Sequence, residues 1–302
     1  MLTIQRHRLA GEQVRFQATP NVGGALAPRF LVFHYTAGSS AASAIATLCT
    51  QKPQANTSAH LVLARDGAIT QLAPFDRVTW HAGTSQWMHV VGLNGTSIGI
   101  EVDNAGPLNL VGDHYVAWFG REIPAAEVML AAHKHGGPVR PWHAYTALQI
   151  ERCLELAELL VAHYGLAEVL GHDDIARGRK LDPGPAFPLA SIAGRVLGRG
   201  DDVLPRYRVT ARSLNIRKGP DAAFDAVAPP LARGTVVTLL EPGHRWSRVE
   251  VDGPTDIEGY VNNLFIEPLP AAAPRAAPRS RRPAAKKTTA RKAVRQSSRQ
   301  PR

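Results

Sequence analysis

Residues 171–188 read Gly-His-Asp-Asp-Ile-Ala-Arg-Gly-Arg-Lys-Leu-Asp-Pro-Gly-Pro-Ala-Phe-Pro. Proline lacks the amide proton and fixes its own φ angle, so this composition argues against a packed helix or a central strand and predicts a shaped loop. Loops on a rigid scaffold often carry the chemistry of a protein. We hypothesise that His172 and Asp182 are two ligands of a catalytic zinc. The alternative is an ordinary solvated polar loop.

The residues ahead of this loop predict a mixed α/β fold. Arg29 to Tyr35 is a nearly continuous apolar run, typical of a strand buried on both faces, with His34 near its end. The clearest helix begins at the capping-box pattern Thr146-Ala-Leu-Gln149 and ends at Gly165. Strands that alternate with helices indicate a mixed β-sheet flanked by helices. The other predicted elements are a helix from about residue 40 to 50, strands at 59–64 and 69–72, and a short helix at 189–197.

Residues 97–103 alternate between apolar and other side chains. Ile98, Ile100 and Val102 share one face, and Glu101 lies on the other. This pattern predicts a half-buried strand whose carboxylate points either to solvent or into a site. Residues 105–145 are rich in Gly, Pro, Trp and His and are predicted to be irregular, with a short helix within 122–133.

Composition divides the 302-residue chain into four segments. Residues 1–198 form the predicted α/β domain, and 199–205 form a linker. Residues 206–269 contain short strands separated by turn signals such as Pro242-Gly243, which predict a small all-β barrel. Residues 270–302 contain mainly Ala, Pro, Lys and Arg, and are predicted to be a disordered basic tail.

The net charge of +10 is concentrated in this tail. Residues 270–302 contain eleven of the 35 Lys and Arg and no acid, which leaves 24 basic and 25 acidic residues elsewhere. The basicity is therefore a property of the tail. Such a tail would bind polyanions by charge, and anionic cell-envelope polymers fit as well as nucleic acid. No base-reading motif accompanies it, which disfavours nucleic acid.

Several compartments are compatible with the sequence. No run of eighteen apolar residues exists, so no membrane span is predicted. Residues 1–16 carry charges and no apolar core, so no Sec-type signal peptide is visible. A cytoplasmic location is the default, and action on the cell envelope or outside the cell would need lysis or a dedicated secretion route. Cys49 and Cys153 fit small core residues rather than a disulfide framework.

Five motifs occur in order between residues 25 and 190. They are His34-Tyr-Thr-Ala-Gly, Ser58-Ala-His60, Trp80-His81-Ala-Gly, Ser97-Ile-Gly-Ile-Glu101 and Gly171-His172 with Lys180-Leu-Asp182-Pro-Gly. Together they resemble the zinc-dependent N-acetylmuramoyl-L-alanine amidases of type 2, a family that includes the peptidoglycan recognition proteins. The resemblance implies hydrolysis of the amide between N-acetylmuramic acid and L-alanine, in polymeric peptidoglycan or in soluble muropeptides. A non-catalytic peptidoglycan-binding protein is the alternative.

The resemblance implies that His34, His172 and Asp182 bind the zinc. Two histidines and a carboxylate suit zinc in a hydrolase, which keeps one position open for water. The resemblance also implies that Glu101 is the general base and later the proton donor. Lys180 would place an ammonium group near the developing oxyanion, and an ordinary surface lysine is the alternative.

The remaining candidates concern substrate binding. His60 and His81 match family positions that line the groove, although support of a metal ligand or plain packing would explain them equally well. Trp80 and Asn94 are further substrate-binding candidates. His133, His135 and His143 form a rival metal cluster by composition. We interpret them as loop residues because no carboxylate accompanies them at a suitable spacing.

The C-terminal strands resemble a bacterial SH3-like module. The resemblance rests on Leu214-Asn-Ile-Arg-Lys-Gly-Pro220, Trp246-Ser-Arg-Val and Gly259-Tyr-Val-Asn. It implies that residues 206–269 bind peptidoglycan peptide, and a passive spacer is the alternative.

Overall fold

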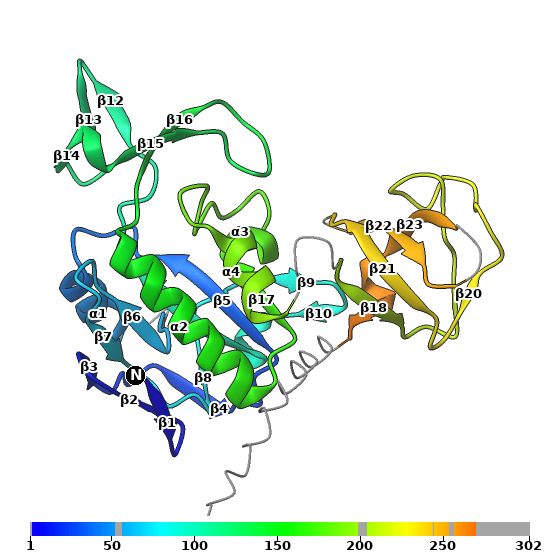
Figure 1. Cartoon of the computed structure of the whole chain (residues 1–302), viewed down its shortest axis with the longest axis horizontal. Helices are drawn as coiled ribbons and strands as arrows, with labels where there is room; N and C mark the ends of the chain where they lie inside the picture. The colour runs from blue at the N-terminus through cyan, green and yellow to red at the C-terminus, as the bar shows by residue number, and fades with distance from the viewer. Residues whose placement is uncertain (1, 52–55, 199–203, 244, 254–256, 270–302) are drawn as a thin grey trace, which may run out of the picture. The chain divides into compact units, whose positions relative to one another are not determined.

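The structure is a computed structural model of the whole chain (Figure 1), and it describes all residues except 1, 52–55, 199–203, 244, 254–256 and 270–302. The predicted tail and most of the predicted linker lie outside the described residues. Within the described part, no helix combines the length and hydropathy needed to cross a membrane.

A six-stranded mixed sheet organises residues 1–198, with the strand order β17-β5-β11-β6-β7-β3. Strand β11 pairs in parallel with both β5 and β6, β17 pairs in parallel with β5, and the β6–β7 hairpin is antiparallel. The carboxyl ends of β5, β11 and β17 therefore meet at one edge of the sheet, where α/β proteins usually build their sites. The bounds are β3 Val14–Phe16, β5 Phe30–Tyr35, β6 Leu61–Leu63, β7 Ile69–Gln71, β11 Ser97–Val102 and β17 Glu168–Gly171.

The predicted strand at 97–103 is confirmed as β11, but the expectation that it is half-buried is wrong. Every residue of β11 is buried except Glu101, which is partly buried. The physical reason is that β11 is an interior strand whose second face is also covered. The ring of His81 lies so close to Gly99 that a Cβ there would come within 2.4 Å of it.

Four α-helices occur in the described part of the chain, and the helices predicted at about 40–50, from Thr146 to Gly165 and at 189–197 are confirmed. Thr146 caps α2 in a capping box, and Gly165 ends it in the left-handed conformation. Helix α2 lies against the sheet (Figure 1) and buries Cys153, Leu156, Ala157 and Leu160 in the main core. The helices are α1 Ala41–Leu48, α2 Ala147–Tyr164, α3 His172–Ile175 and α4 Leu189–Val196.

Residues 171–188, which were predicted to form a shaped loop, are only partly a loop. The first of them ends β17, and His172 begins α3, whose single turn is capped by Asp174, which accepts a hydrogen bond from the Gly171 amide at 2.8 Å. The prolines start at residue 183, so none of them blocks this turn. The remainder, up to α4, has the irregular structure that the prolines predict.

The prediction of an irregular segment with a short helix within 122–133 is wrong. Residues 109–123 form a three-stranded antiparallel sheet, and residues 128–143 form a hairpin, with only one 3₁₀ turn between them. Gly112 and Gly120 make the tight turns with φ of 63° and 89°. The strands are β12 Asn109–Val111, β13 His114–Val116, β14 Glu122–Ile123, β15 Val128–Ala131 and β16 Arg140–His143.

Short strand pairs complete residues 1–198, and the C-terminal strands are all antiparallel. The pairs are β1 Thr3–Gln5 with β2 Arg8–Ala10, β4 Val22–Ala25 with β8 Arg77–Thr79, and β9 Gln86–Trp87 with β10 Val90–Val91. Residues 206–268 contain a five-stranded sheet of order β23-β22-β21-β18-β24 and the pair β19–β20. These strands are β18 Arg206–Val209, β19 Ser213–Leu214, β20 Leu231–Ala232, β21 Val236–Glu241, β22 Trp246–Val251, β23 Glu258–Asn262 and β24 Ile266–Pro268. The all-β character predicted for this segment is confirmed.

Candidate metal centre and catalytic site

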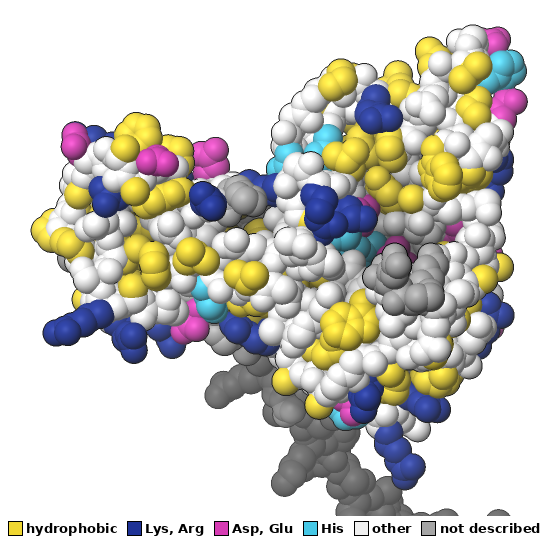
Figure 2. Space-filling model, turned by 180° about the vertical axis from the view of Figure 1, so that it is seen from behind, with side chains coloured by type: hydrophobic (Ala, Val, Ile, Leu, Met, Phe, Trp, Pro, Cys, Tyr) yellow, Lys and Arg dark blue, Asp and Glu magenta, His cyan; other side chains and the backbone are white. Residues whose placement is uncertain are grey.

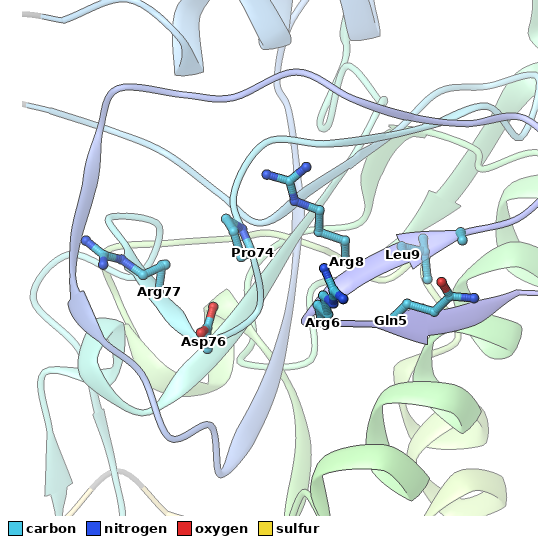
Figure 3. A pocket seen from close by; sticks show the side chains of 8 residues that line it. Gln5, Arg6, Arg8, Leu9, Pro74, Asp76 and Arg77 are labelled. Atoms are coloured by element: carbon cyan, nitrogen blue, oxygen red, sulfur yellow. The ribbon is translucent and has the colours of Figure 1, made fainter.

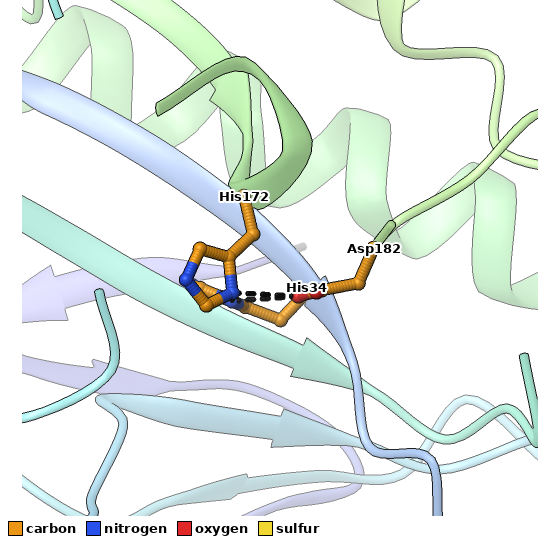
Figure 4. Close-up of side chains that lie close together, drawn as sticks. All are labelled: His34, His172 and Asp182. Atoms are coloured by element: carbon orange, nitrogen blue, oxygen red, sulfur yellow. Dashed lines mark hydrogen bonds and ion pairs between the residues drawn. The ribbon is translucent and has the colours of Figure 1, made fainter. Parts of the chain in front are cut away.

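Three of the predicted site residues converge at the edge where the parallel strands end (Figure 4). His34 lies near the end of β5, His172 follows β17, and Asp182 comes from the loop after α3. His34 Nδ1 lies 2.9 Å from His172 Nδ1, and each of these nitrogens lies within 3.0 Å of Asp182 Oδ2. The three side chains are only 1%, 3% and 5% exposed. No other group of three or more candidate metal ligands occurs among the described residues.

The hydrogen bonds of His172 leave a lone pair directed at this cluster. His172 Nε2 lies 3.1 Å from the Ala82 carbonyl oxygen, which can only accept, so the neutral ring carries its proton on Nε2. Its Nδ1 lone pair then faces the oxygen of Asp182. Two lone pairs at this distance repel each other unless a cation lies between them. The arrangement therefore fits a bound metal ion.

A second hydrogen-bond chain orients His34 in the same way. The Ser97 hydroxyl donates to the Leu93 carbonyl oxygen at 2.7 Å and lies 3.2 Å from His81 Nε2, so it accepts the proton of that nitrogen. His81 Nδ1 is then free to accept from His34 Nε2 at 2.9 Å. Burial lowers the pKa of His34 to about 4 and the pKa of His81 well below its usual value, which keeps both rings neutral. His34 thus also presents an Nδ1 lone pair to the cluster.

Glu101 lies beside the cluster with one unpartnered oxygen. Its position on β11 is in register with His34 on β5. Its Oε2 is buried and has no hydrogen-bond partner among the described residues. Burial, reinforced by the charge of Asp182, raises the pKa of Glu101 to about 8, although Lys180 opposes the shift. A carboxyl group whose pKa lies near neutral pH can both take up and release a proton.

Lys180 is partly buried, and it is close enough to His34 and Glu101 for its charge to affect both. Its charge lowers the pKa of His34 and the pKa of Glu101. This placement favours a role at the site over that of an ordinary surface lysine.

The four predicted substrate-binding residues differ in burial and contacts, and the ring centroids of His60 and His81 lie 6.1 Å apart. His60 is completely buried, and its ring nitrogens contact the Thr79 hydroxyl, the Gly99 amide and the Arg77 carbonyl, which favours the packing interpretation. His81 lies behind His34, as described above. Asn94 Oδ1 accepts a hydrogen bond from the Ala82 amide at 2.7 Å, and Trp80 is 39% exposed.

One further polar group joins Asp173 to His133 and Lys134, and sequence spacing did not reveal it because these residues are far apart in the chain. The loop between β15 and β16 carries His133 and Lys134, which lie 3.0 Å and 2.8 Å from the carboxylate oxygens of Asp173. A carboxylate does accompany His133 in space, although it lies 40 residues away in the sequence, and the structure does not place His133 in a group that could hold a metal ion. Asp173 is 1% exposed, and burial raises its pKa to about 7. Its position next to His172 was the only feature of the sequence that pointed to Asp173 as part of the site.

Two cavities have different relations to the cluster. A cavity of about 350 Å³ includes Glu101 in its lining. A larger one of about 780 Å³ is lined by β1 and β2, the turn between them and the segment that leads into β8, with residues such as Arg6, Arg8 and Asp76 (Figure 3), and it contains no residue of the cluster. The space-filling view shows a hollow in which histidine and acidic side chains are visible, with basic side chains at its rim (Figure 2).

The chain resembles known proteins over more than half of its length. Residues 24–185, more than half of the chain, match the type 2 family described as N-acetylmuramoyl-L-alanine amidase. The chain is 33% identical over 179 residues to the N-acetylmuramoyl-L-alanine amidase AmiD of Escherichia coli, which covers 58% of this chain and 55% of AmiD. It is also 33% identical over 135 residues to the 1,6-anhydro-N-acetylmuramyl-L-alanine amidase AmpD of the same organism, covering 44% of this chain and 55% of AmpD.

The chain thus spans about half the length of the curated relatives it matches. Among solved structures, the AmiD complex with anhydro-N-acetylmuramic acid-L-Ala-D-gamma-Glu-L-Lys is 27% identical, with a TM-score of 0.43 and coverage of 68% of this chain and 67% of that one. On the family match, this chain belongs to the type 2 N-acetylmuramoyl-L-alanine amidases.

Proposed function

We propose that the chain is a zinc-dependent amidase that hydrolyses the amide bond between N-acetylmuramic acid and L-alanine in peptidoglycan or muropeptides. The observation that carries this proposal is the convergence of two imidazole lone pairs and a carboxylate beside an unpartnered glutamate. The activities in the names of AmiD and AmpD support the same reaction.

His34, His172 and Asp182 would hold the metal. Two nitrogens and one oxygen form a donor set typical of catalytic zinc, whereas calcium and magnesium prefer oxygen ligands alone. When bound, zinc polarises a carbonyl group and lowers the pKa of a coordinated water to about 7. The hydrogen bonds to His81 and to the Ala82 carbonyl fix a proton on Nε2 of His34 and of His172. Each Nδ1 can therefore bind the metal without rearrangement.

Glu101 and Lys180 would perform the proton transfer and charge stabilisation. Glu101 takes a proton from the attacking water and then delivers it to the nitrogen of L-alanine as the amide bond breaks. Its unpartnered Oε2 and its pKa of about 8 suit both steps. The Lys180 ammonium stabilises the negative charge that develops on the scissile carbonyl oxygen.

The rival function is peptidoglycan binding without turnover. A binding protein has no need of a carboxyl group beside the ligand cluster whose pKa lies near neutral pH. The presence of Glu101 and Lys180 beside the complete ligand set therefore favours the enzyme.

Incubation with intact sacculi and, separately, with soluble muropeptides tests the reaction. Mass spectrometry of the products should identify a free N-acetylmuramoyl carboxyl group and a peptide that begins with L-alanine. The relative rates decide between polymeric and soluble substrate. Binding to sacculi without these fragments would favour the rival function.

The C-terminal all-β segment would act as an SH3-like module that binds peptidoglycan peptide and holds the enzyme on its polymer. Its antiparallel strands and its motifs support this assignment. The basic tail would add charge-driven binding to anionic envelope polymers. Retention on purified sacculi should fall when residues 200–302 are deleted, and unchanged retention would leave the segment as a spacer. A salt-sensitive shift of duplex DNA that disappears on removal of 270–302 would instead indicate nucleic-acid binding.

A further inference from the structure

The cavity of about 780 Å³ lies between the β1–β2 hairpin and the segment that leads into β8 (Figure 3). Its volume falls within the range of about 300–1,000 Å³ that is typical of ligand pockets. It contains no residue of the metal cluster and none of the predicted substrate-binding residues, so the reaction proposed above leaves it without a role. The lining consists of Gln5, Arg6, Arg8, Leu9, Ala10, Pro74, Asp76 and Arg77.

Three of these residues are arginines, and most of their side-chain N–H donors are not used by other described residues. None of the three forms an ion pair within the described part of the chain, and the side chain of Arg6 forms no hydrogen bond there either. Arg77 uses one donor, because its Nη2 donates to the Gly23 carbonyl oxygen at 2.7 Å. The guanidinium of Arg8 lies over the Phe16 ring, with Cζ 3.9 Å from the ring centroid. That stacking holds the Arg8 side chain and leaves its N–H groups free to donate in the guanidinium plane.

The lining of the cavity carries a positive net charge. Three arginines contribute three positive charges and Asp76 contributes the one negative charge, which leaves +2. The Asp76 carboxylate also lies 3.9 Å from His7 Nε2, outside the set of arginines. A cavity lined mainly by one sign of charge attracts ligands of the opposite sign. These charges therefore favour an anionic ligand.

Buried contacts hold the turn between β1 and β2 in place. Arg6 and His7 have φ of 48° and 62°, which is uncommon for residues other than glycine. The His7 carbonyl oxygen accepts from the Phe75 amide at 3.0 Å and from Gln71 Nε2 at 3.1 Å. Gln71 is completely buried, and its Oε1 accepts from the Leu9 amide at 2.7 Å. The positions on either side of His7, which carry two of the arginines, are thus fixed before a ligand binds, which lowers the entropic cost of binding.

Arginines on two sides of one cavity fit a phosphate group better than a carboxylate. Arginine binds both groups through paired N–H donors. A carboxylate has two oxygens in one plane, and a single guanidinium can occupy both. The oxygens of a phosphate group point in several directions, so they can accept from guanidiniums on the hairpin and on β8 at the same time. Leu9, Ala10 and Pro74 add apolar surface to the lining, which suits an organic ester rather than the free ion alone.

From these observations we propose that this cavity is an anion site that binds the phosphate group of a phosphorylated organic ligand through Arg6, Arg8 and Arg77. A soluble phosphate ester and the phosphate of a lipid headgroup share this chemistry. The site is separate from the metal cluster, so the proposal does not rest on the proposed amidase activity.

Binding of a phosphate ester to the full chain tests the proposal. The probe is glycerol 3-phosphate, titrated by calorimetry at low ionic strength, and sodium acetate is the carboxylate comparison. The ester should bind more tightly than acetate. We expect Arg6→Gln to weaken binding of the ester at least about tenfold, because paired charge-assisted hydrogen bonds are lost. The side chain of Arg6 has no hydrogen bond to lose within the described residues, so the thermal midpoint of this variant should equal that of wild type.

Two further variants supply matched comparisons. Arg233→Gln removes the same charge at an exposed arginine that does not line the cavity, and its affinity for the ester should equal that of wild type. Asp76→Asn removes the acid of the lining and should tighten binding about threefold or more. A gain of affinity does not follow from a damaged fold, so Asp76→Asn gives the sharper result.

Vesicles separate the two sources of the phosphate group. Flotation with phosphatidylglycerol vesicles, compared with phosphatidylcholine vesicles, measures binding to an anionic headgroup. If Arg6→Gln loses affinity for both the ester and phosphatidylglycerol, the site accepts a lipid headgroup. If it loses affinity for the ester alone, the site accepts a soluble ligand.

Wild-type protein that binds glycerol 3-phosphate no better than acetate would overturn the proposal. So would equal affinities for the ester in Arg6→Gln and Arg233→Gln, because the basic charge of the whole chain would then explain the binding. A failure of the proposed function gives a different result. A chain that cleaves no muropeptide and binds the ester through Arg6 would refute the amidase activity and keep the anion site.

Discussion

His81 Nδ1 lies 2.9 Å from His34 Nε2, on the side of the His34 ring that faces away from Asp182. His81 thereby fixes the proton of His34 and orients its ring, although it contributes no ligand atom itself. Replacing the hydrogen-bonding partner of a metal-binding histidine typically weakens metal affinity 10–100-fold. We expect His81→Phe to lower zinc affinity by this range in a competition titration against a chelator.

His114→Gln is the matched control, because His114 lies on β13 with its side chain 56% exposed. Its zinc affinity should equal that of wild type. Wild-type affinity in His81→Phe would mean that the ring of His34 is held by packing alone.

Glu101 and Lys180 should be required for cleavage but dispensable for metal binding. Loss of a general acid–base typically costs 10²–10⁴-fold in rate, and loss of an oxyanion donor 10²–10³-fold. We therefore expect Glu101→Gln and Lys180→Ala to lower kcat by at least about 100-fold. Each variant should keep one zinc per chain by elemental analysis. Wild-type turnover in either variant would remove that residue from the mechanism.

The buried His60 should make the fold sensitive to acid. Burial lowers its pKa to about 4, and only the hydrogen bond to the Arg77 carbonyl opposes the shift. Because the folded pKa lies below the unfolded value of about 6.5, the unfolded chain binds more protons in this window. The stability is complete above pH 6.5 and is lost as the pH falls toward 4, by about 2 kcal/mol at pH 5.

Urea unfolding at pH 7 and pH 5 measures this loss. His60→Gln, which cannot be protonated, should show a smaller loss than wild type over the same interval. An equal loss in both proteins would assign the acid sensitivity to other groups.

Lys134 should stabilise the fold through a buried partner. Its ammonium contacts Asp173 and Asp174 at 2.8 Å each, and the side chain of Asp173 is only 2% exposed. Removing one member of such a pair leaves a buried charge without full compensation. Because Lys134 itself is 39% exposed, we expect Lys134→Ala to cost about 1–2 kcal/mol of unfolding free energy.

Lys218→Ala supplies the comparison, because the Lys218–Asp225 pair is exposed on both sides. Exposed pairs contribute about 0–1 kcal/mol, so this variant should unfold close to wild type. Equal losses of unfolding free energy in the two variants would show that the contact with Asp173 stabilises the fold no more than an exposed ion pair does.

Local sequence patterns were sufficient for β5, which carries His34, but not for β17 or α3, at whose junction His172 lies. The apolar run of β5, the capping box of α2 and the proline-rich loop each reflect neighbouring residues, so their positions could be predicted. Proximity of His34 to His172 also follows from two parallel strands that end at one edge. That prediction needed the family resemblance, since spacing alone does not say which strands pair.

Contacts between distant segments could not be predicted. Trp118 meets the Ala37 carbonyl across 81 residues, and His133 meets Asp173 across 40. Both depend on the turns between short strands in 105–145, where each strand is too short for hydrophobic periodicity to be visible. The burial of His60 likewise depends on distant segments, because the register of β11 and β6 brings it next to Gly99 and its Nε2 lies 2.9 Å from the carbonyl oxygen of Arg77 on β8.

The most direct test of the account is cleavage of a soluble muropeptide by one preparation in three states. The protein is assayed as purified, after removal of metal with a chelator that is then dialysed away, and after addition of one equivalent of zinc. We predict cleavage at the N-acetylmuramoyl–L-alanine bond, its loss with the metal, and its return with zinc, but no return in His34→Ala. Cleavage at an unchanged rate in the metal-free, folded protein would contradict the account.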